Sequence, residues 1–131
     1  MKILVDTCVW SEVLRYRHPN EALANRLQDF IHDGRLVMVG PVRQELLSGI
    51  SDLKQFHQLQ EILSAFEDIP LSTAHFEKAA EFHNVCRKKG VQGSSIDFLI
   101  CAVAHLDHLI IFTSDGDFET YKKYLPMHIM Q

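Results

Sequence analysis

The chain has 131 residues, of which 47% are hydrophobic and 23% are charged, and its formal net charge is −4. This length predicts a single domain over residues 1–131, and the composition is typical of a folded globular protein rather than a disordered chain. The first apolar run is far too short for a signal peptide or a membrane span, so we expect a cytoplasmic protein without membrane contact. Three widely spaced cysteines with no CxxC pair predict free thiols rather than a disulfide framework or a zinc site.

Strand-like and helix-like segments alternate along the chain. Short apolar runs that predict strands lie at residues 2–5, 36–39, 109–113 and 127–130. Apolar residues at helical spacing predict helices at residues 9–14, 20–32, 41–49, 53–66, 76–86 and 96–106, with a short aromatic helix after residue 117. This alternation implies an α/β layered fold with a mostly parallel central sheet flanked by helices, in which functional residues gather at the carboxyl ends of the strands.

Five acidic residues could hold a hard divalent cation, which prefers oxygen ligands, but each has a simpler structural role. Asp6 could be only the N-cap of the helix that follows the first strand, and Glu45 could be a solvated residue of an early helical turn. Asp97 lies where a capping box would place an acid, although so apolar a helix has little reason to carry one. Asp115 and Asp117 flank a glycine, and Asp-Gly turns are common for local reasons alone.

The order and the local sequence of these acids resemble PIN-domain ribonucleases. The matching segments are Val5-Asp6-Thr7 with Trp10, Pro41 through Glu45, Ser95-Ile96-Asp97 leading into Ala102, and Thr113 through Phe118. Each segment alone is a weak signal, but the ordered set covers nearly the whole chain and is most similar to the VapC toxins of prokaryotic type II toxin–antitoxin pairs. The resemblance implies a PIN-like three-layer sandwich.

The resemblance also implies a metal-dependent endoribonuclease that hydrolyses RNA phosphodiester bonds as the toxin of such a pair. It assigns catalysis and the binding of magnesium or manganese (Mg²⁺ or Mn²⁺) to an acidic cluster: Asp6, Glu45, Asp97 and Asp115, with Asp117 as a second candidate for the last position. Thr7 and Thr113 would orient ligands or water. Cys8 stands where many relatives have serine or asparagine, so its side chain would give only the weak polar help of a thiol.

The partners implied by the resemblance are an RNA substrate, a VapB-like antitoxin and a second copy of the chain in a homodimer. The antitoxin would cover the acidic cleft with its tail and could insert an Arg or Lys beside the carboxylates. Arg15, Arg17 and Arg43 are candidates for contacts with the RNA backbone, although Arg43 could equally be an ordinary surface residue. The run Arg87-Lys88-Lys89 is a weaker candidate, because basic residues are favoured in a last helical turn by the helix dipole.

Other functions for the same sequence stay open. The chain could be a PIN-type nuclease that processes RNA without an antitoxin, or a PIN-type module that only binds RNA or protein. All four acidic positions are filled, which favours catalysis over binding alone. Haloacid dehalogenases are disfavoured because Asp6-Thr7-Cys8 lacks their second acid, and response-regulator receivers are disfavoured because their ordered set of acids and lysine is missing.

Overall fold

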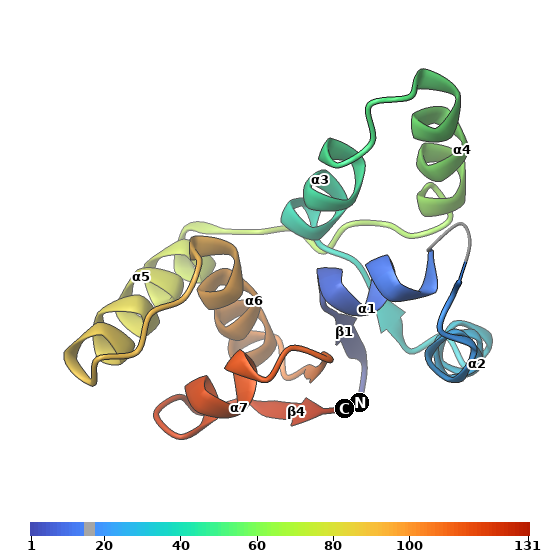
Figure 1. Cartoon of the computed structure of the whole chain (residues 1–131). Helices are drawn as coiled ribbons and strands as arrows, with labels where there is room; N and C mark the ends of the chain where they lie inside the picture. The colour runs from blue at the N-terminus through green and yellow to red at the C-terminus, as the bar shows by residue number, and fades with distance from the viewer. Residues whose placement is uncertain (15–17) are drawn as a thin grey trace.

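The computed structural model describes residues 1–14 and 18–131, which form a four-stranded sheet and seven helices (Figure 1). The strands are β1 (Ile3–Val5), β2 (Leu36–Val37), β3 (Ile110–Phe112) and β4 (His128–Met130). They lie in the order β2-β1-β3-β4, and every neighbouring pair is parallel. The predicted α/β fold is confirmed, and the sheet of the described residues is wholly rather than mostly parallel.

Each predicted helix is present. The helices are α1 (Thr7–Val13), α2 (Glu21–His32), α3 (Gly40–Ser48), α4 (Leu53–Leu63), α5 (Thr73–Lys88), α6 (Ser95–Leu106) and α7 (Asp117–Lys122). In Figure 1, α2 lies on one side of the sheet and α5 with α6 on the other, which gives three layers. The side chains agree with this, because Phe30 of α2 packs edge-on against Phe112 of β3, while α6 also contacts β3.

Helix α6 is the central helix of the fold. Its residues Phe98 through Ala104 are all buried, so the helix has no solvent face over nearly two turns. It packs along α5, and the two are joined where α5 begins and α6 ends. The imidazole Nδ1 of His75 accepts a hydrogen bond from the Ser72 backbone N–H at 3.0 Å, which leaves Nε2–H to donate to Asp107 Oδ1 at 3.1 Å.

The strand order creates a topological switch point, and we call the region at the carboxyl ends of β1 and β3 the crevice. From β1 the chain crosses to β2 on one side, whereas β3 lies on the other side of β1, and ligands of open α/β sheets bind at such a switch point. The backbone N–H of Asp6 donates to Phe112 O at 2.9 Å, so the residue after β1 lies beside the end of β3. The segments that follow both strands therefore meet.

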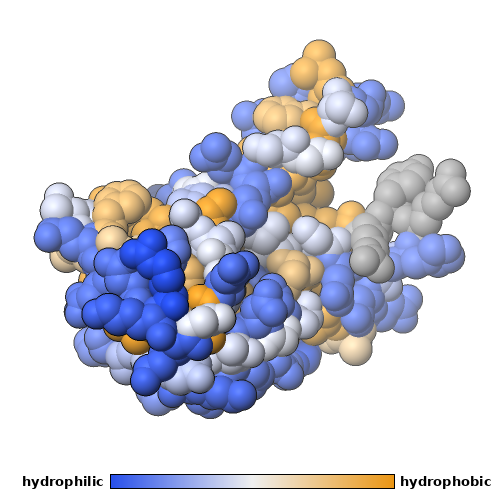
Figure 2. All heavy atoms as spheres, turned by 60° about the vertical axis from the view of Figure 1, so that its left-hand side comes forward, coloured by the Kyte–Doolittle hydropathy of each residue, from blue (hydrophilic) through white to orange (hydrophobic). Residues whose placement is uncertain are grey.

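The face of the molecule shown in Figure 2 is mainly hydrophilic, with apolar residues interspersed and some at the tip of the projecting arm formed by α3 and α4. The exposed large apolar side chains include Leu53 and Ile62 on α4 and Phe76 on α5. No helix in the described residues combines the length and the apolar character needed to cross a membrane.

Candidate functional site

Asp6 combines the role of a helix cap with a buried position at the crevice. It is the N-cap of α1, where its Oδ1 accepts the Thr7 backbone N–H at 2.8 Å. Its Oδ2 accepts the hydroxyl of Thr113 at 3.0 Å and the thiol of Cys8 at 3.2 Å. Only 5% of Asp6 is exposed, and this burial raises its pKa, which the charge of Asp115 raises further.

Asp97 lies on the first turn of α6 and faces the same crevice. Its backbone N–H donates to the N-cap Ser94 Oγ at 3.0 Å, while its carboxylate Oδ2 accepts the Tyr121 hydroxyl at 2.8 Å. Burial raises the pKa of Asp97, and the negative charges of Asp6 and Asp115 add to that increase. The fold therefore brings three carboxylates from separate elements close enough to repel one another.

Thr113 connects Asp6 to the loop after β3. Its hydroxyl donates to Asp6 and accepts the backbone N–H of Asp115 at 3.0 Å. Asp115 is half-buried, and its Oδ1 accepts the backbone N–H of Asp117 at 2.9 Å. Asp117 is exposed at the start of α7, and its charge acts on Tyr121 rather than on Asp6 or Asp97. This geometry favours Asp115 over Asp117 as the member of the acidic cluster.

Glu45 reaches the site from α3, at its outer margin. The side chain is exposed, and its Oε1 accepts the Thr7 hydroxyl at 2.7 Å. Thr7 is the first residue of α1, so this hydrogen bond joins the α3 acid to the residue next to Asp6. Glu45 is thus linked to the carboxylate cluster through Thr7 and lies farther from its centre than Asp97 or Asp115.

Arg43 does not have the role expected from the sequence. Its guanidinium donates through Nε to Asp68 Oδ1 at 3.0 Å, through Nη1 to Leu63 O at 2.9 Å and through Nη2 to Phe66 O. These donors are committed to the end of α4 and to the segment that follows it, which contradicts the expectation that Arg43 contacts RNA. The other two arginines of that expectation, Arg15 and Arg17, lie outside the described residues.

Glu12 and Tyr121 contact the site but were not assigned a role from the sequence. The Cys8 thiol contacts Asp6 and accepts the Ser114 hydroxyl at 3.3 Å, and that hydroxyl is also 3.2 Å from Glu12 Oε1. Glu12 follows Cys8 by four positions, so both lie on one face of α1, and this spacing could have identified it. Tyr121 follows Asp117 by four positions in the same way, but the sequence indicated only a short aromatic helix there.

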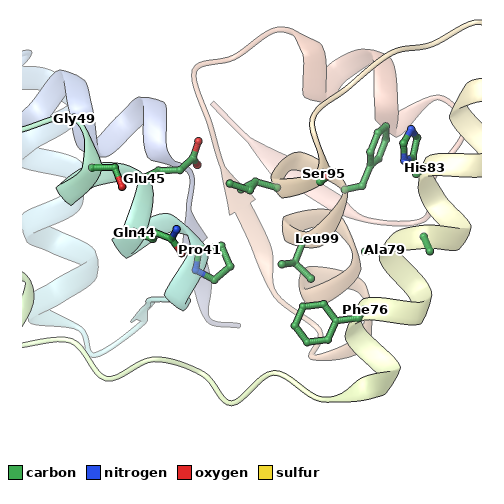
Figure 3. Close-up of a pocket in the computed structure, with 13 residues that line it drawn as sticks. Pro41, Gln44, Glu45, Gly49, Phe76, Ala79, His83, Ser95 and Leu99 are labelled. Atoms are coloured by element: carbon green, nitrogen blue, oxygen red, sulfur yellow. The ribbon is translucent and has the colours of Figure 1, made fainter.

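An apolar pocket of about 820 Å³ opens beside Glu45, between α3 and the α5–α6 pair. Figure 3 shows Pro41 and Glu45 on one side of the pocket and Leu99 and Phe76 on the other. Ser95, one residue after the N-cap of α6, also lines it. Glu45 therefore borders both the acidic site, through Thr7, and an apolar pocket whose other wall is formed by α5 and α6.

The family model described as the PIN domain matches residues 3–124. Ribonuclease VapC11 of Mycobacterium tuberculosis is 29% identical over 119 residues, which is 89% of this chain and 89% of that protein.

Two solved structures share the fold. The structure of FitAcB from Neisseria gonorrhoeae superposes with a TM-score of 0.80 at 24% identity, covering 98% of this chain and 96% of that one. A toxin–antitoxin complex from Klebsiella pneumoniae superposes with a TM-score of 0.69 at 19% identity, covering 89% of this chain and 90% of that one. At these identities the structural likeness shows the fold alone.

Proposed function

The chain belongs to the PIN-domain family, and on this basis we propose that it is a metal-dependent endoribonuclease that acts as the toxin of a toxin–antitoxin pair. The ribonuclease activity is supported by the relative named Ribonuclease VapC11, which is similar over 89% of both chains. Among the residues predicted from the sequence, we assign Asp6, Asp97 and Asp115 to the centre of the site and Glu45 and Thr7 to its margin.

The observation that carries this proposal is the convergence of one buried carboxylate, Asp6, and two partly buried ones, Asp97 and Asp115, at the switch point. Asp6 and Asp97 both have raised pKa values because of burial, and Asp115 acts on both. Such an arrangement is unfavourable for a protein on its own and typical of a functional site, because perturbed acids gather where a cation or a substrate compensates them. Within residues 1–14 and 18–131, no basic side chain is among the groups that shift the pKa of either acid.

The donor set fits a hard cation that keeps part of its water shell. No group of three acidic, histidine or cysteine side chains in the described residues is close enough to hold an ion by itself. Mg²⁺ commonly binds through only one or two carboxylates and completes its shell with waters and substrate phosphate oxygens. We therefore propose that Asp6 and Asp97 bind it directly, and that Glu45 and Asp115 act through water.

A divalent cation in this site would lower the pKa of a bound water and stabilise negative charge on the phosphate. The protein's own side chains would orient the carboxylates for hydrolysis. Thr113 holds Asp6 through Oδ2, and Thr7 holds Glu45. Asp115 Oδ1 already accepts a backbone N–H, so its Oδ2 is the oxygen we propose for accepting a proton from the attacking water as the P–O bond breaks.

The partner we propose is a VapB-like antitoxin whose tail covers the acidic crevice. The toxin–antitoxin complex from Klebsiella pneumoniae shares the fold, which supports this class of partner without identifying it. A basic side chain of the antitoxin would neutralise the repelling carboxylates in place of the cation. Homodimer formation and action on RNA in the cytoplasm belong to the same proposal.

The proposal is tested by incubating purified protein, freed of any antitoxin, with total cellular RNA in Mg²⁺, Mn²⁺ or EDTA. We expect discrete fragments with either ion and none with EDTA. Asp6→Asn and Asp97→Asn should each reduce the cleavage rate by at least about 100-fold, since each removes a charged oxygen ligand. Asp29→Asn, which changes an exposed acid of α2, is the matched control and should cleave normally.

Two other outcomes would favour the alternatives. Equal cleavage by wild type and both site variants would mean that the acids do not catalyse the reaction. Retained RNA binding without cleavage would favour the binding module. Its supporting observation is that no three acidic, histidine or cysteine side chains of the described residues lie close enough to hold an ion by themselves. If the protein cleaves RNA but no neighbouring gene encodes an antitoxin, the RNA-processing nuclease would be favoured over the toxin.

A further inference from the structure

Tyr121 of α7 is a buried tyrosine whose hydroxyl reaches out of the core to the acidic site. Only 1% of the residue is exposed, and its hydroxyl donates to Asp97 Oδ2 at 2.8 Å. Asp97 Oδ1 accepts no hydrogen bond from the residues that the structure describes. The two oxygens of this carboxylate are therefore in different surroundings, one fixed by a phenol and one open.

The chain leaves room for this hydroxyl at Gly93, just before α6. A Cβ placed on Gly93 would lie 2.8 Å from Tyr121 Cζ and 2.9 Å from Phe98 Cζ, and it would also collide with the Tyr121 hydroxyl. Carbon atoms in proteins essentially never approach so closely without a shift of one partner. Gly93 is thus required by the close approach of the tyrosine to the backbone rather than by its own dihedral angles.

The aromatic rings around Tyr121 leave it little freedom to move. Its ring packs 5.1 Å from Phe98 and 5.2 Å from Phe118, and both of those residues are buried. Phe98 is stacked in turn on His83, at 5.1 Å between centroids. The hydroxyl is consequently presented to Asp97 from a rigid support, and the hydrogen bond fixes the rotation of the carboxylate.

We propose that Tyr121 is a positioning residue for Asp97: its hydroxyl holds Oδ2 so that Oδ1 points to the cation, and Gly93 provides the space this requires. The inference rests on the proposed function, because it assigns a role in cation binding. Partners of this kind, which orient a ligand without touching the ion, change metal affinity when they are removed.

The test is Tyr121→Phe, which deletes one oxygen atom and keeps the ring. Binding of Mn²⁺ is measured without RNA by electron paramagnetic resonance, and we expect the dissociation constant to rise about 10-fold. Cleavage at limiting Mn²⁺ should fall by the same factor and return towards the wild-type rate at saturating Mn²⁺. Tyr124→Phe is the matched control, because Tyr124 is 40% exposed, and it should change neither quantity.

A second variant, Gly93→Ala, displaces the hydroxyl without removing it. It should weaken Mn²⁺ binding as well, and its effect combined with Tyr121→Phe should be smaller than the sum of the two, because both act on one hydrogen bond. Wild-type Mn²⁺ affinity in a folded Tyr121→Phe protein would overturn the inference while leaving the nuclease intact. A wild-type protein that binds no Mn²⁺ and cleaves no RNA would instead refute the proposed function, and the inference with it.

Discussion

At the scale of the residue, the carboxylates of Asp6 and Asp97 are held where their charge is disfavoured. Burial raises the pKa of each, and the nearby charge of Asp115 raises both further. The hydrogen bonds from Thr113 to Asp6 and from Tyr121 to Asp97 oppose this only in part. The metal-free protein therefore carries electrostatic strain at its candidate site, as functional sites commonly do.

Removing one of these charges should stabilise the metal-free protein. A carboxyl group with a raised folded pKa contributes stability below its ordinary value of 3.8, and that contribution is lost as the pH rises through the folded pKa. Asp97→Asn cannot ionise, and its amide oxygen can still accept the Tyr121 hydroxyl. At pH 7 in EDTA we expect its free energy of unfolding to exceed that of wild type by about 0.5–2 kcal/mol.

Urea unfolding of both proteins across the range from pH 4 to pH 8 measures this difference, which should shrink towards the acid end. Added Mg²⁺ should stabilise wild type and leave Asp97→Asn nearly unchanged, since only the former binds the ion tightly. Asp29→Asn is again the control for loss of a surface charge. A variant less stable than wild type at pH 7 would contradict the electrostatic argument.

The acidic residues of the site could be proposed from the sequence, but the hydrogen bonds that hold them could not. That Asp6 caps a helix was predictable from a strand followed by apolar residues at helical spacing, and it is confirmed. The hydrogen bond from Tyr121 to Asp97 was not predictable, because it depends on how α7 packs against α6. The assignment of catalysis to these acids stays a prediction.

At the scale of the element, α3 and α4 form an arm that stands out from the sheet (Figure 1). Arg43 of α3 links the two helices of the arm. Its guanidinium donates to the carbonyl of Leu63 at the end of α4, and to the carbonyl of Phe66 and the carboxylate of Asp68 just after it. Glu45, two residues later, bonds Thr7. Helix α3 therefore carries Glu45 at the site, and Arg43 on the same helix anchors it to the end of α4.

Arg43→Lys should destabilise the protein although it keeps the charge, because one ammonium cannot replace a guanidinium that bonds three acceptors. We expect the free energy of unfolding to fall by about 1–3 kcal/mol, the usual range when bonds to a charged group are lost. Arg87→Lys, at an exposed arginine whose one side-chain bond within the described residues is to Asn84, should stay within about 0.5 kcal/mol. Unchanged stability with weaker RNA binding in EDTA would restore the original expectation for Arg43.

Helix and strand identities were predictable, whereas their ends were less so. The apolar spacing predicted a helix over residues 53–66, but α4 ends at Leu63 because the chain turns there and Phe66 packs against Trp10. The expected strand at residues 36–39 pairs with β1 only at Leu36 and Val37, after which Met38 bridges to Asp68. Periodicity records which side chains are apolar, and the tertiary contact decides where each element ends.

At the scale of the whole molecule, the buried side chains of the described residues form one continuous cluster that includes both sides of the sheet. This supports our proposal that the chain is a single domain. The parallel sheet could be predicted from the alternation of strands and helices, since parallel neighbours need a crossover between them. The strand order could not, because several right-handed connections satisfy the same alternation.

The elements differ in how firmly they are joined to this core. Helix α6 is buried over Phe98–Ala104 and contacts both β3 and α5, whereas α4 makes its main contacts with α3 and exposes Leu53 and Ile62. Segments with few buried contacts open locally at a lower free energy than the whole molecule. Native-state hydrogen exchange should therefore find backbone amides of α4 at least about 10-fold less protected than those of α6. Equal protection of the two helices would mean that the arm unfolds only with the entire domain, so that Glu45 would be held as rigidly as Asp97.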